Sequence, residues 1–368
     1  MSEENGIALM QFPKEVLQRL QPDLVFKRHL NLGLRPRSLM KFDECRDVIS
    51  VSTDSITCDN QATQESNTII VSSNTSKVGA SMVIKTDISL GVSEVDNSYS
   101  NQYAQIWPEV VVNRGRLGAP TDEEMIASRL VYEDFIAGRF VKQDDLIIKE
   151  VGIKNSEDDK VNYDVEDVDE ETINEVRNKY TFVLYAKINV YSREGPVYDH
   201  VHNSLMSALT KLQVPRVFIE EDSIDLKIPI KKSFNKKQTE KTKKTFNLKF
   251  DFESMKKIEL FNKITIASNF GVVTTDPTIL IETEERGDES MDVEKPELNK
   301  EKIMISDISS DIEEQTILSR VSVSCNENGY SSINLVNGHN LDKITINDLK
   351  KVLEMAKLKH KSLYKNLE

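Results

Sequence analysis

The clearest pattern of apolar and polar positions lies in residues 180–219. Within 180–191 every even-numbered position from 182 to 190 is apolar, whereas the odd-numbered positions mix valine, tyrosine, lysine and asparagine. This alternation predicts a central strand with one face in a core. A turn at 193–196 follows, and apolar residues at helical spacing between 201 and 212 then predict a helix that ends before Pro215.

The start of this predicted helix is a candidate anion site. Asp199 or Asn203 is placed to cap its N-terminus. Free backbone amides at a helix start, next to a strand end, favour a bound anion. Whether such a site is used decides whether the protein is an enzyme.

The rest of the pattern predicts short strands with two further well-marked helices. One helix starts at Thr121 with Glu124 three positions later, which is the spacing of a capping box, and a C-terminal helix starts at Thr345 with Asp348. Strands are predicted at 68–71, 77–85, 106–112, 146–153, 223–229, 245–252, 302–307, 317–325 and 333–336, with turns at 72–76 and 269–271. This order predicts a mixed α+β fold with two sheet-and-helix halves.

Composition narrows the class of protein. The chain has 368 residues, of which 38% are hydrophobic, enough for two domains with real cores. No apolar run approaches the roughly 20 residues of a membrane span, so no membrane partner is expected. The acidic N-terminus lacks the basic start and apolar middle of a signal peptide, which favours a cytosolic or nuclear protein.

The net charge of −13 argues against a protein that binds nucleic acid by bulk positive charge alone. Acidic stretches near 155–175 and at 282–301 are predicted to be solvated insertions. A lysine-rich connection lies at 231–244 and has two interpretations. Its lysines contact the phosphate backbone of RNA, which the chain could then bind on its own, or they keep the tip of a hairpin soluble.

Catalytic and metal motifs are sparse. The three cysteines are far apart, so neither a zinc ribbon nor a disulfide framework is predicted. His200 and His202 lack the i, i+4 spacing of a helical metal site, and no metal or cofactor is predicted. Nucleophile-elbow, Walker A and dinucleotide motifs are also missing from the sequence. Asp276 follows a β pattern but has no defined partner acid, so the residues alone leave the activity uncertain.

Several motifs together resemble the RNase PH family. They lie at 32–37 with Phe42 and Arg46, at 77–84, at 107–124, at 195–216 and at 267–277, and so cover nearly the whole chain. The combination is most similar to the RNase PH-like ring subunits of the eukaryotic RNA exosome. The resemblance implies an RNase PH-like fold whose first half is like domain 2 of ribosomal protein S5. It also implies an arm at 1–31, a first domain at 32–216 and a second domain at 217–368.

The resemblance also implies partners. They are other RNase PH-like subunits in a hetero-hexameric ring, cap subunits with S1 and KH folds, RNA in the ring channel and an associated hydrolytic exonuclease. The expected role is 3′-to-5′ processing and degradation of RNA, including ribosomal RNA maturation, RNA surveillance and mRNA turnover, in the nucleus, nucleolus and cytoplasm. Arg114 and Arg116 form a glycine-spaced basic loop that suits phosphate contacts. A salt bridge within the chain or at a subunit interface is the alternative for both.

Departures from the active family members predict that this chain is not an enzyme. Active members carry Gly-Thr-Arg or Gly-Ser-Arg at the head of the helix, whereas residues 201–205 read Val-His-Asn-Ser-Leu. Bidentate capture of phosphate by arginine is then lost. Active members also place paired acids on a strand of the second half, and the comparable region at 275–280 offers only Asp276. The alternative is an active phosphate-dependent 3′-to-5′ exoribonuclease with a rearranged site.

Overall fold

The fold is taken from a computed structural model of the protein. The described residues are 13, 16, 19–36, 39–53, 69–95, 102–115, 118–154, 161–163, 179–220, 248–274, 302–338 and 343–367. The lysine-rich connection at 231–244, the insertion at 282–301, most of the insertion near 155–175, Arg116 and Asp276 lie outside them. No helix in the described part of the chain is long and apolar enough to cross a membrane.

The strand predicted at 180–191 lies inside a five-stranded sheet. The sheet has the order β1 (Val48–Thr53), β2 (Ile69–Val78), β3 (Met82–Glu94), β7 (Tyr180–Tyr191) and β4 (Ile106–Val112). β7 pairs antiparallel with β3 and parallel with β4. Its even-numbered apolar side chains are buried, and Tyr185, Lys187 and Tyr191 are exposed, so the predicted alternation is confirmed.

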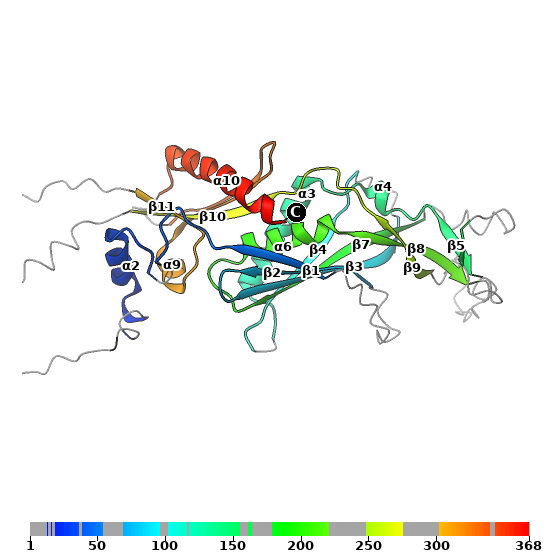
Figure 1. The fold of residues 1–368 in the computed structure, drawn as a ribbon, viewed down its shortest axis with the longest axis horizontal. Coiled ribbons are helices and arrows are strands. Elements are labelled where there is room, and N and C mark those ends of the chain that lie inside the picture. The colour runs from blue at the N-terminus through cyan, green and yellow to red at the C-terminus, as the bar shows by residue number, and fades with distance from the viewer. Residues whose placement is uncertain are drawn as a thin grey trace, which may run out of the picture.

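Helix α6 (Tyr198–Thr210) lies between this sheet and a second one, which we call the C-terminal sheet. The antiparallel C-terminal sheet has the order β11 (Lys302–Ser306), β10 (Ile266–Thr274), β12 (Ser319–Cys325) and β13 (Tyr330–Val336). Helix α10 (Ile346–Leu367) lies along its other face (Figure 1). Val352 and Ala356 of this helix share a buried cluster with Phe270 of β10 and with Val321 and Val323 of β12. β10 is therefore covered on both faces and is buried along almost its whole length.

The remaining elements lie around this layered core. A third sheet has the order β6 (Val161–Asn162), β5 (Val151–Lys154), β8 (Gln213–Glu220) and β9 (Leu248–Lys257) at one end of the molecule (Figure 1). At the other end α2 (Pro22–Asn31) packs on α9 (Asp311–Thr316). The other helices are α3 (Asp122–Gly138) and α4 (Gln143–Leu146). The capping boxes predicted at Thr121 and Thr345 are confirmed.

The turn predicted at 72–76 is wrong, because β2 continues through this polar segment. Its inward polar side chains find partners on α6: Ser72 donates to the carbonyl of Ala208 at 2.8 Å, and Asn74 donates to the carbonyl of Ser204 at 3.3 Å. A polar layer between sheet and helix thus satisfies side chains that would otherwise favour a turn.

Two further predictions differ from the structure. No turn occurs at 269–271, where β10 is continuous, because Asn269 Oδ1 accepts the backbone N–H of Ile308 at 2.9 Å. Gly271 is needed there for close packing, since an added Cβ would lie 2.7 Å from Ile317. The strand predicted at 146–153 is confirmed only at its end, where β5 begins at Val151. Leu146 is the last residue of the short helix α4, and Ile147 makes only an isolated bridge to Thr181.

Candidate functional site

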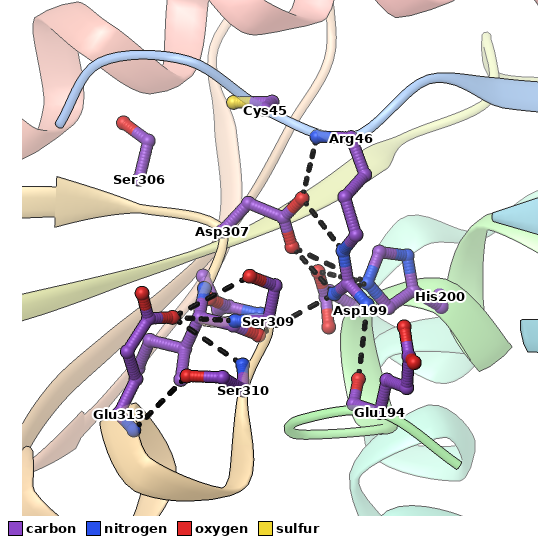
Figure 2. Close-up of polar contacts among 12 residues, drawn as sticks. Cys45, Arg46, Glu194, Asp199, His200, Ser306, Asp307, Ser309, Ser310 and Glu313 are labelled. Atoms are coloured by element: carbon purple, nitrogen blue, oxygen red, sulfur yellow. Dashed lines mark hydrogen bonds and ion pairs between the residues drawn. The ribbon is translucent and has the colours of Figure 1, made fainter. Parts of the chain in front are cut away.

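A buried polar cluster joins three distant parts of the chain at the start of α6 (Figure 2). It contains Arg46, just before β1, Asp199 and His200, in the first turn of α6, and Asp307, just after β11. Their exposed fractions are 8%, 1%, 4% and 1%, respectively. We call these four residues the α6 cluster.

A glycine turn brings the start of α6 against the loop that carries Asp307. Gly195 has φ of +72°, and a Cβ there would lie 2.2 Å from the carbonyl oxygen of Ile308. Only glycine permits both the backbone conformation and the close approach. Helix α6 then begins at Tyr198, which is earlier than the head at 201–205 expected from the family resemblance.

The predicted capping of α6 is wrong. No side chain caps the helix, and Asp199 lies inside its first turn. Asn203 lies one turn further on and joins α6 to β10. Its Nδ2 donates to the carbonyl of Ala267 at 2.9 Å, and its Oδ1 accepts the N–H of Ala267 at 2.8 Å. Asn203 is therefore a structural residue.

The guanidinium of Arg46 donates hydrogen bonds through all three of its nitrogen atoms. Its Nε and Nη2 donate to the two carboxylate oxygens of Asp307 at 3.0 and 2.7 Å, and its backbone N–H donates to the same carboxylate at 2.8 Å. Nη1 donates to the carbonyl of Glu194 at 3.0 Å. Nη2 also lies 2.8 Å from His200 Nε2.

Asp307 is a stable anion in this environment. Burial on its own raises the pKa of a carboxyl group, but the charge of Lys359 and the hydrogen bonds to the carboxylate outweigh burial and hold the pKa of Asp307 well below its usual value. The Arg46–Asp307 pair is therefore a bidentate ion pair with both partners ionised.

Asp199 places a second negative charge at the start of α6. Neither of its carboxylate oxygens accepts a hydrogen bond from the described residues, and Oδ2 lies 3.5 Å from His200 Nε2. Asp199 lies in the first turn of α6, at the end of the helix where the dipole favours negative charge. The anion position predicted at the helix start thus holds a carboxylate of the chain itself.

The cluster contains a possible set of metal ligands. Asp199, His200 and Asp307 offer ligand atoms that all lie within 4.8 Å of one another. A metal ion would have to lie roughly 2.0–2.2 Å from the same His200 nitrogen and Asp307 oxygen that contact Arg46 Nη2. The ion and the guanidinium cannot occupy that space together. In this arrangement Arg46 is the cation of the cluster.

A second buried ion pair holds the loop after β11. Arg35 and Glu313 are both buried and form a bidentate contact with distances of 2.8 and 2.7 Å. Arg35 also donates to the carbonyls of Ser306 at 2.9 Å and Asp307 at 2.5 Å. Glu313 belongs to a capping box with Ser310 at the start of α9. Arg35 thereby fixes the backbone from which the Asp307 side chain projects.

The candidate RNA contact Arg114 lies in a separate network. Its guanidinium is 2.7 Å from Glu123, which also accepts from Arg193 Nε at 2.8 Å. Arg193 continues to Glu314 at 2.6 Å. An ion pair within the chain, one of the alternatives for this loop, is therefore present. Arg114 remains 37% exposed at its side chain, so its role in RNA contact stays a prediction.

The two close histidines belong to different networks. His202 Nε2 lies 3.0 Å from Thr265 Oγ1, and its Nδ1 lies 3.6 Å from Asp134. The Asp134, His202 and Thr265 side chains lie in the order of an acid–base–nucleophile triad, but His202 Nδ1 makes no hydrogen bond with the described residues. They are 3%, 0% and 1% exposed, so a substrate cannot reach them. We assign them to the core.

Acidification is expected to destabilise the protein through His202. Burial lowers the pKa of His202 below the ordinary 6.5, although Asp134 acts in the opposite direction. The unfolded chain then takes up a proton first as the pH falls below about 6.5, so the stability present above that value is lost. Urea unfolding of the wild type and of His202→Gln at about pH 7.5 and 5.5 measures this effect. We expect a smaller pH dependence in the variant. Equal pH dependence would assign the effect to other groups, such as His360, whose pKa is also lowered by burial.

An open groove of about 1160 Å³ lies beside the α6 cluster, between the segment at 41–47, β11 and α10. Met304, Met355 and Lys359 are among its lining residues, together with Cys45 and Arg46. Burial raises the pKa of the Cys45 thiol, so this thiol is protonated at neutral pH and is a poor nucleophile. The groove therefore offers no activated nucleophile from Cys45.

The sequence matches no family model and no curated protein. Its structure is similar to a solved structure described as an archaeal exosome core, with a TM-score of 0.53 and 10% identity, covering 97% of this chain and 99% of that one. It is also similar to the Archaeoglobus fulgidus exosome with RNA bound to the active site, with a TM-score of 0.56 and 12% identity, covering 96% and 100%. These likenesses confirm the predicted α+β, RNase PH-like fold.

Sequence reasoning named three of the four residues of the α6 cluster. Arg46 stands among the residues that carry the family resemblance, and Asp199 and His200 were considered as a cap and as a metal ligand. Asp307 was missed because its partner Arg46 lies 261 positions away in the chain, and Glu313, in the neighbouring ion pair, was missed as well. The capping-box spacing of Ser310 and Glu313 is a local signal that would have marked the start of α9.

Proposed function

We propose that this chain is a non-catalytic structural subunit of an exosome core ring, closest to the ribosomal-RNA-processing forty-three type. The fold likeness to exosome core structures supports the assignment to the ring. The α6 cluster is the single observation that supports the proposed lack of catalytic activity. It fills the helix start with paired charges of the chain itself.

Phosphorolysis needs an inorganic phosphate beside the scissile bond. A helix start binds phosphate when its amides are open and a free arginine or lysine is near. Here the buried Asp199 carboxylate occupies the first turn of α6, and a phosphate brought there would meet like charge. Arg46 already neutralises Asp307. These features support the loss of phosphate capture.

The proposed role is to provide shape and interfaces. The chain would stand in a hetero-hexameric ring with other RNase PH-like subunits, below cap subunits of S1 and KH type. RNA would pass through the channel to an associated hydrolytic exonuclease that does the 3′-to-5′ cleavage. Arg114, on an exposed loop after β4, and Arg116 are the proposed RNA contacts. We place this work in the nucleus, including the nucleolus, and in the cytoplasm.

The purified protein is expected to release no nucleoside diphosphate from single-stranded RNA in the presence of phosphate. The assay compares the wild type with Asp307→Asn and Asp276→Ala, and a phosphorolytic nuclease serves as the positive control. Phosphate-dependent release that either substitution abolishes would contradict the proposal and establish the active exoribonuclease. Native mass spectrometry of the tagged chain from its own cells tests the ring assignment, which recovery of the chain alone would contradict.

A further inference from the structure

We infer that the C-terminal end of α3 holds a pocket that binds an unpaired base of a single-stranded nucleic acid. The pocket has a volume of about 340 Å³. Two side-chain amides, one phenol ring and one guanidinium line it, from Gln102, Gln105, Tyr103 and Arg139. These residues belong neither to the α6 cluster nor to the basic loop at 114–116, so the pocket goes beyond the contacts of the proposed function.

Backbone hydrogen bonds hold the walls of this pocket in place. The N–H of Ala104 donates to the carbonyl of Val141 at 2.9 Å. The N–H of Phe261 donates to the carbonyl of Phe140 at 2.7 Å. Three segments that are distant in the sequence are thereby joined at the end of α3, and the pocket is formed before any ligand arrives.

Exposed aromatic rings flank the pocket. Tyr103, Gln105 and Trp107 alternate with buried residues and so lie on the same side of an extended segment. Trp107 is 51% exposed and stacks on Tyr132 of α3, with 5.5 Å between the ring centroids. The Tyr103 ring lies 5.7 Å from that of Phe261, which is 50% exposed. Aromatic rings of this kind are the surfaces on which unpaired bases stack.

Two exposed cations rest on these rings. The guanidinium carbon of Arg139 lies 5.3 Å from the centroid of the Tyr103 ring, and Lys142 Nζ lies 4.7 Å from that of Phe261. Neither cation forms an ion pair with a described residue. A guanidinium over a ring extends the stack, and a nucleobase can stack on its open side. Lys142 is then available to the phosphate of the same strand.

The backbone at Arg139 supports a functional reason for the arginine. This residue ends α3 in a left-handed conformation with φ of +50°, where glycine is the common residue. Glycine instead occupies position 138, where an added Cβ would lie 2.2 Å from the Phe140 ring. The chain therefore keeps a strained arginine at a position that glycine would adopt without strain, and such strain gathers at binding sites.

The chemistry of the pocket favours a nucleic acid strand over a peptide. A proline-rich peptide would use the rings but leave both cations without a partner. A single strand supplies bases for the rings and phosphates for the cations. The amides match the donors and acceptors of a base edge: Gln105 Oε1 accepts from the Tyr132 hydroxyl at 3.4 Å, and its NH2 group remains a donor. A duplex keeps its bases paired and stacked, so it does not fit the pocket.

The variant Arg139→Gly separates binding from folding. Glycine adopts the left-handed conformation freely, so this variant should resist urea at least as well as the wild type. Its affinity for a labelled single strand of about twelve nucleotides should fall about tenfold, as expected for the loss of one stacked base. Arg129→Gln removes the same charge from a 78% exposed side chain of α3 and should bind as the wild type does. Fluorescence anisotropy with the full-length chain measures the affinities, for RNA and for DNA of the same sequence.

Photo-cross-linking with RNA that contains 4-thiouridine maps the contact on the wild-type chain. Cross-links should fall on the peptides that hold Tyr103 and Trp107, and duplex RNA should bind at least about tenfold more weakly than the single strand. Loss of affinity in Arg139→Gly with either RNA or DNA supports the pocket.

Four results would overturn the pocket as a base-binding site. They are no measurable binding of a single strand by the wild type, equal affinity of the wild type and Arg139→Gly, an equal loss in Arg139→Gly and Arg129→Gln, and cross-links confined to 114–116 or 231–244. Binding of a proline-rich peptide without any oligonucleotide falls under the first. The pocket belongs to the chain by itself, so its failure leaves the proposed ring role standing. Recovery of the chain alone from its own cells would contradict the ring role and leave the pocket standing.

Discussion

Replacing Arg35 with methionine is expected to lower the free energy of unfolding by about 3–5 kcal/mol, because it leaves a buried charge without its partner. Arg35 is fully buried and makes a bidentate ion pair with Glu313. It also donates to the carbonyls of Ser306 and Asp307. Methionine fills much of the volume but satisfies none of these groups. Urea unfolding at neutral pH measures the loss.

The double variant Arg35→Met/Glu313→Gln separates charge from hydrogen bonding. Glutamine removes the unpaired charge and can still accept from the backbone of Ser310, so the double variant should be more stable than Arg35→Met alone. The control is Arg129→Met, whose side chain is 78% exposed and pairs with Glu133 on the helix surface. This control should unfold as the wild type does. An Arg35→Met protein with wild-type stability would refute the role of the pair.

Elements that depend on local signals follow directly from the sequence. The alternation in β7 matches one buried and one exposed face because its period coincides with that of a strand. The capping boxes at Thr121 and Thr345 locate helix starts because side chain and backbone within four residues satisfy one another. These elements can therefore be predicted from the local sequence alone.

Elements that depend on distant partners were mispredicted. Ser72 and Asn74 read as turn residues, and only the approach of α6, more than 120 residues later, gives them hydrogen-bond partners inside a strand. Asn269, Phe270 and Gly271 likewise read as a turn. Their burial in β10 depends on the loop at 307–308 and on Ile317. Long-range polar satisfaction overrides local propensity at both places.

The α6 cluster could not be predicted from the sequence for the same reason, since its members are distant in the chain. Arg46 and Asp307 are separated by 261 positions in the chain, and neither carries a local mark of its partner. Asp307 also adopts a left-handed backbone with φ of 55°, which aspartate tolerates better than most residues. The family resemblance pointed to Arg46 and to the helix that follows β7. It could not show that the helix begins at Tyr198 and holds Asp199 inside its first turn.

The role of Arg46 as the cation of the cluster leads to the second large effect. Arg46→Met leaves Asp307 and Asp199 buried without their guanidinium, and the expected loss is again about 3–5 kcal/mol in the free energy of unfolding. Unlike Arg35→Met, this substitution also vacates the space between three potential ligand atoms. Asp199, His200 and Asp307 then offer two carboxylates and an imidazole to a divalent ion. Zinc accepts such a set.

Zinc should therefore restore part of the stability of Arg46→Met and leave the wild type unchanged. An ion that binds only the folded state stabilises it by about 2.7 kcal/mol when its concentration is a hundred times its dissociation constant. Urea unfolding with added zinc and with chelator measures the difference, and Arg46→Met/His200→Gln is the control that lacks the imidazole. Equal stabilisation of the wild type and Arg46→Met would mean that zinc binds elsewhere. That result would refute the view that the arginine occupies the place of a metal ion at the start of α6.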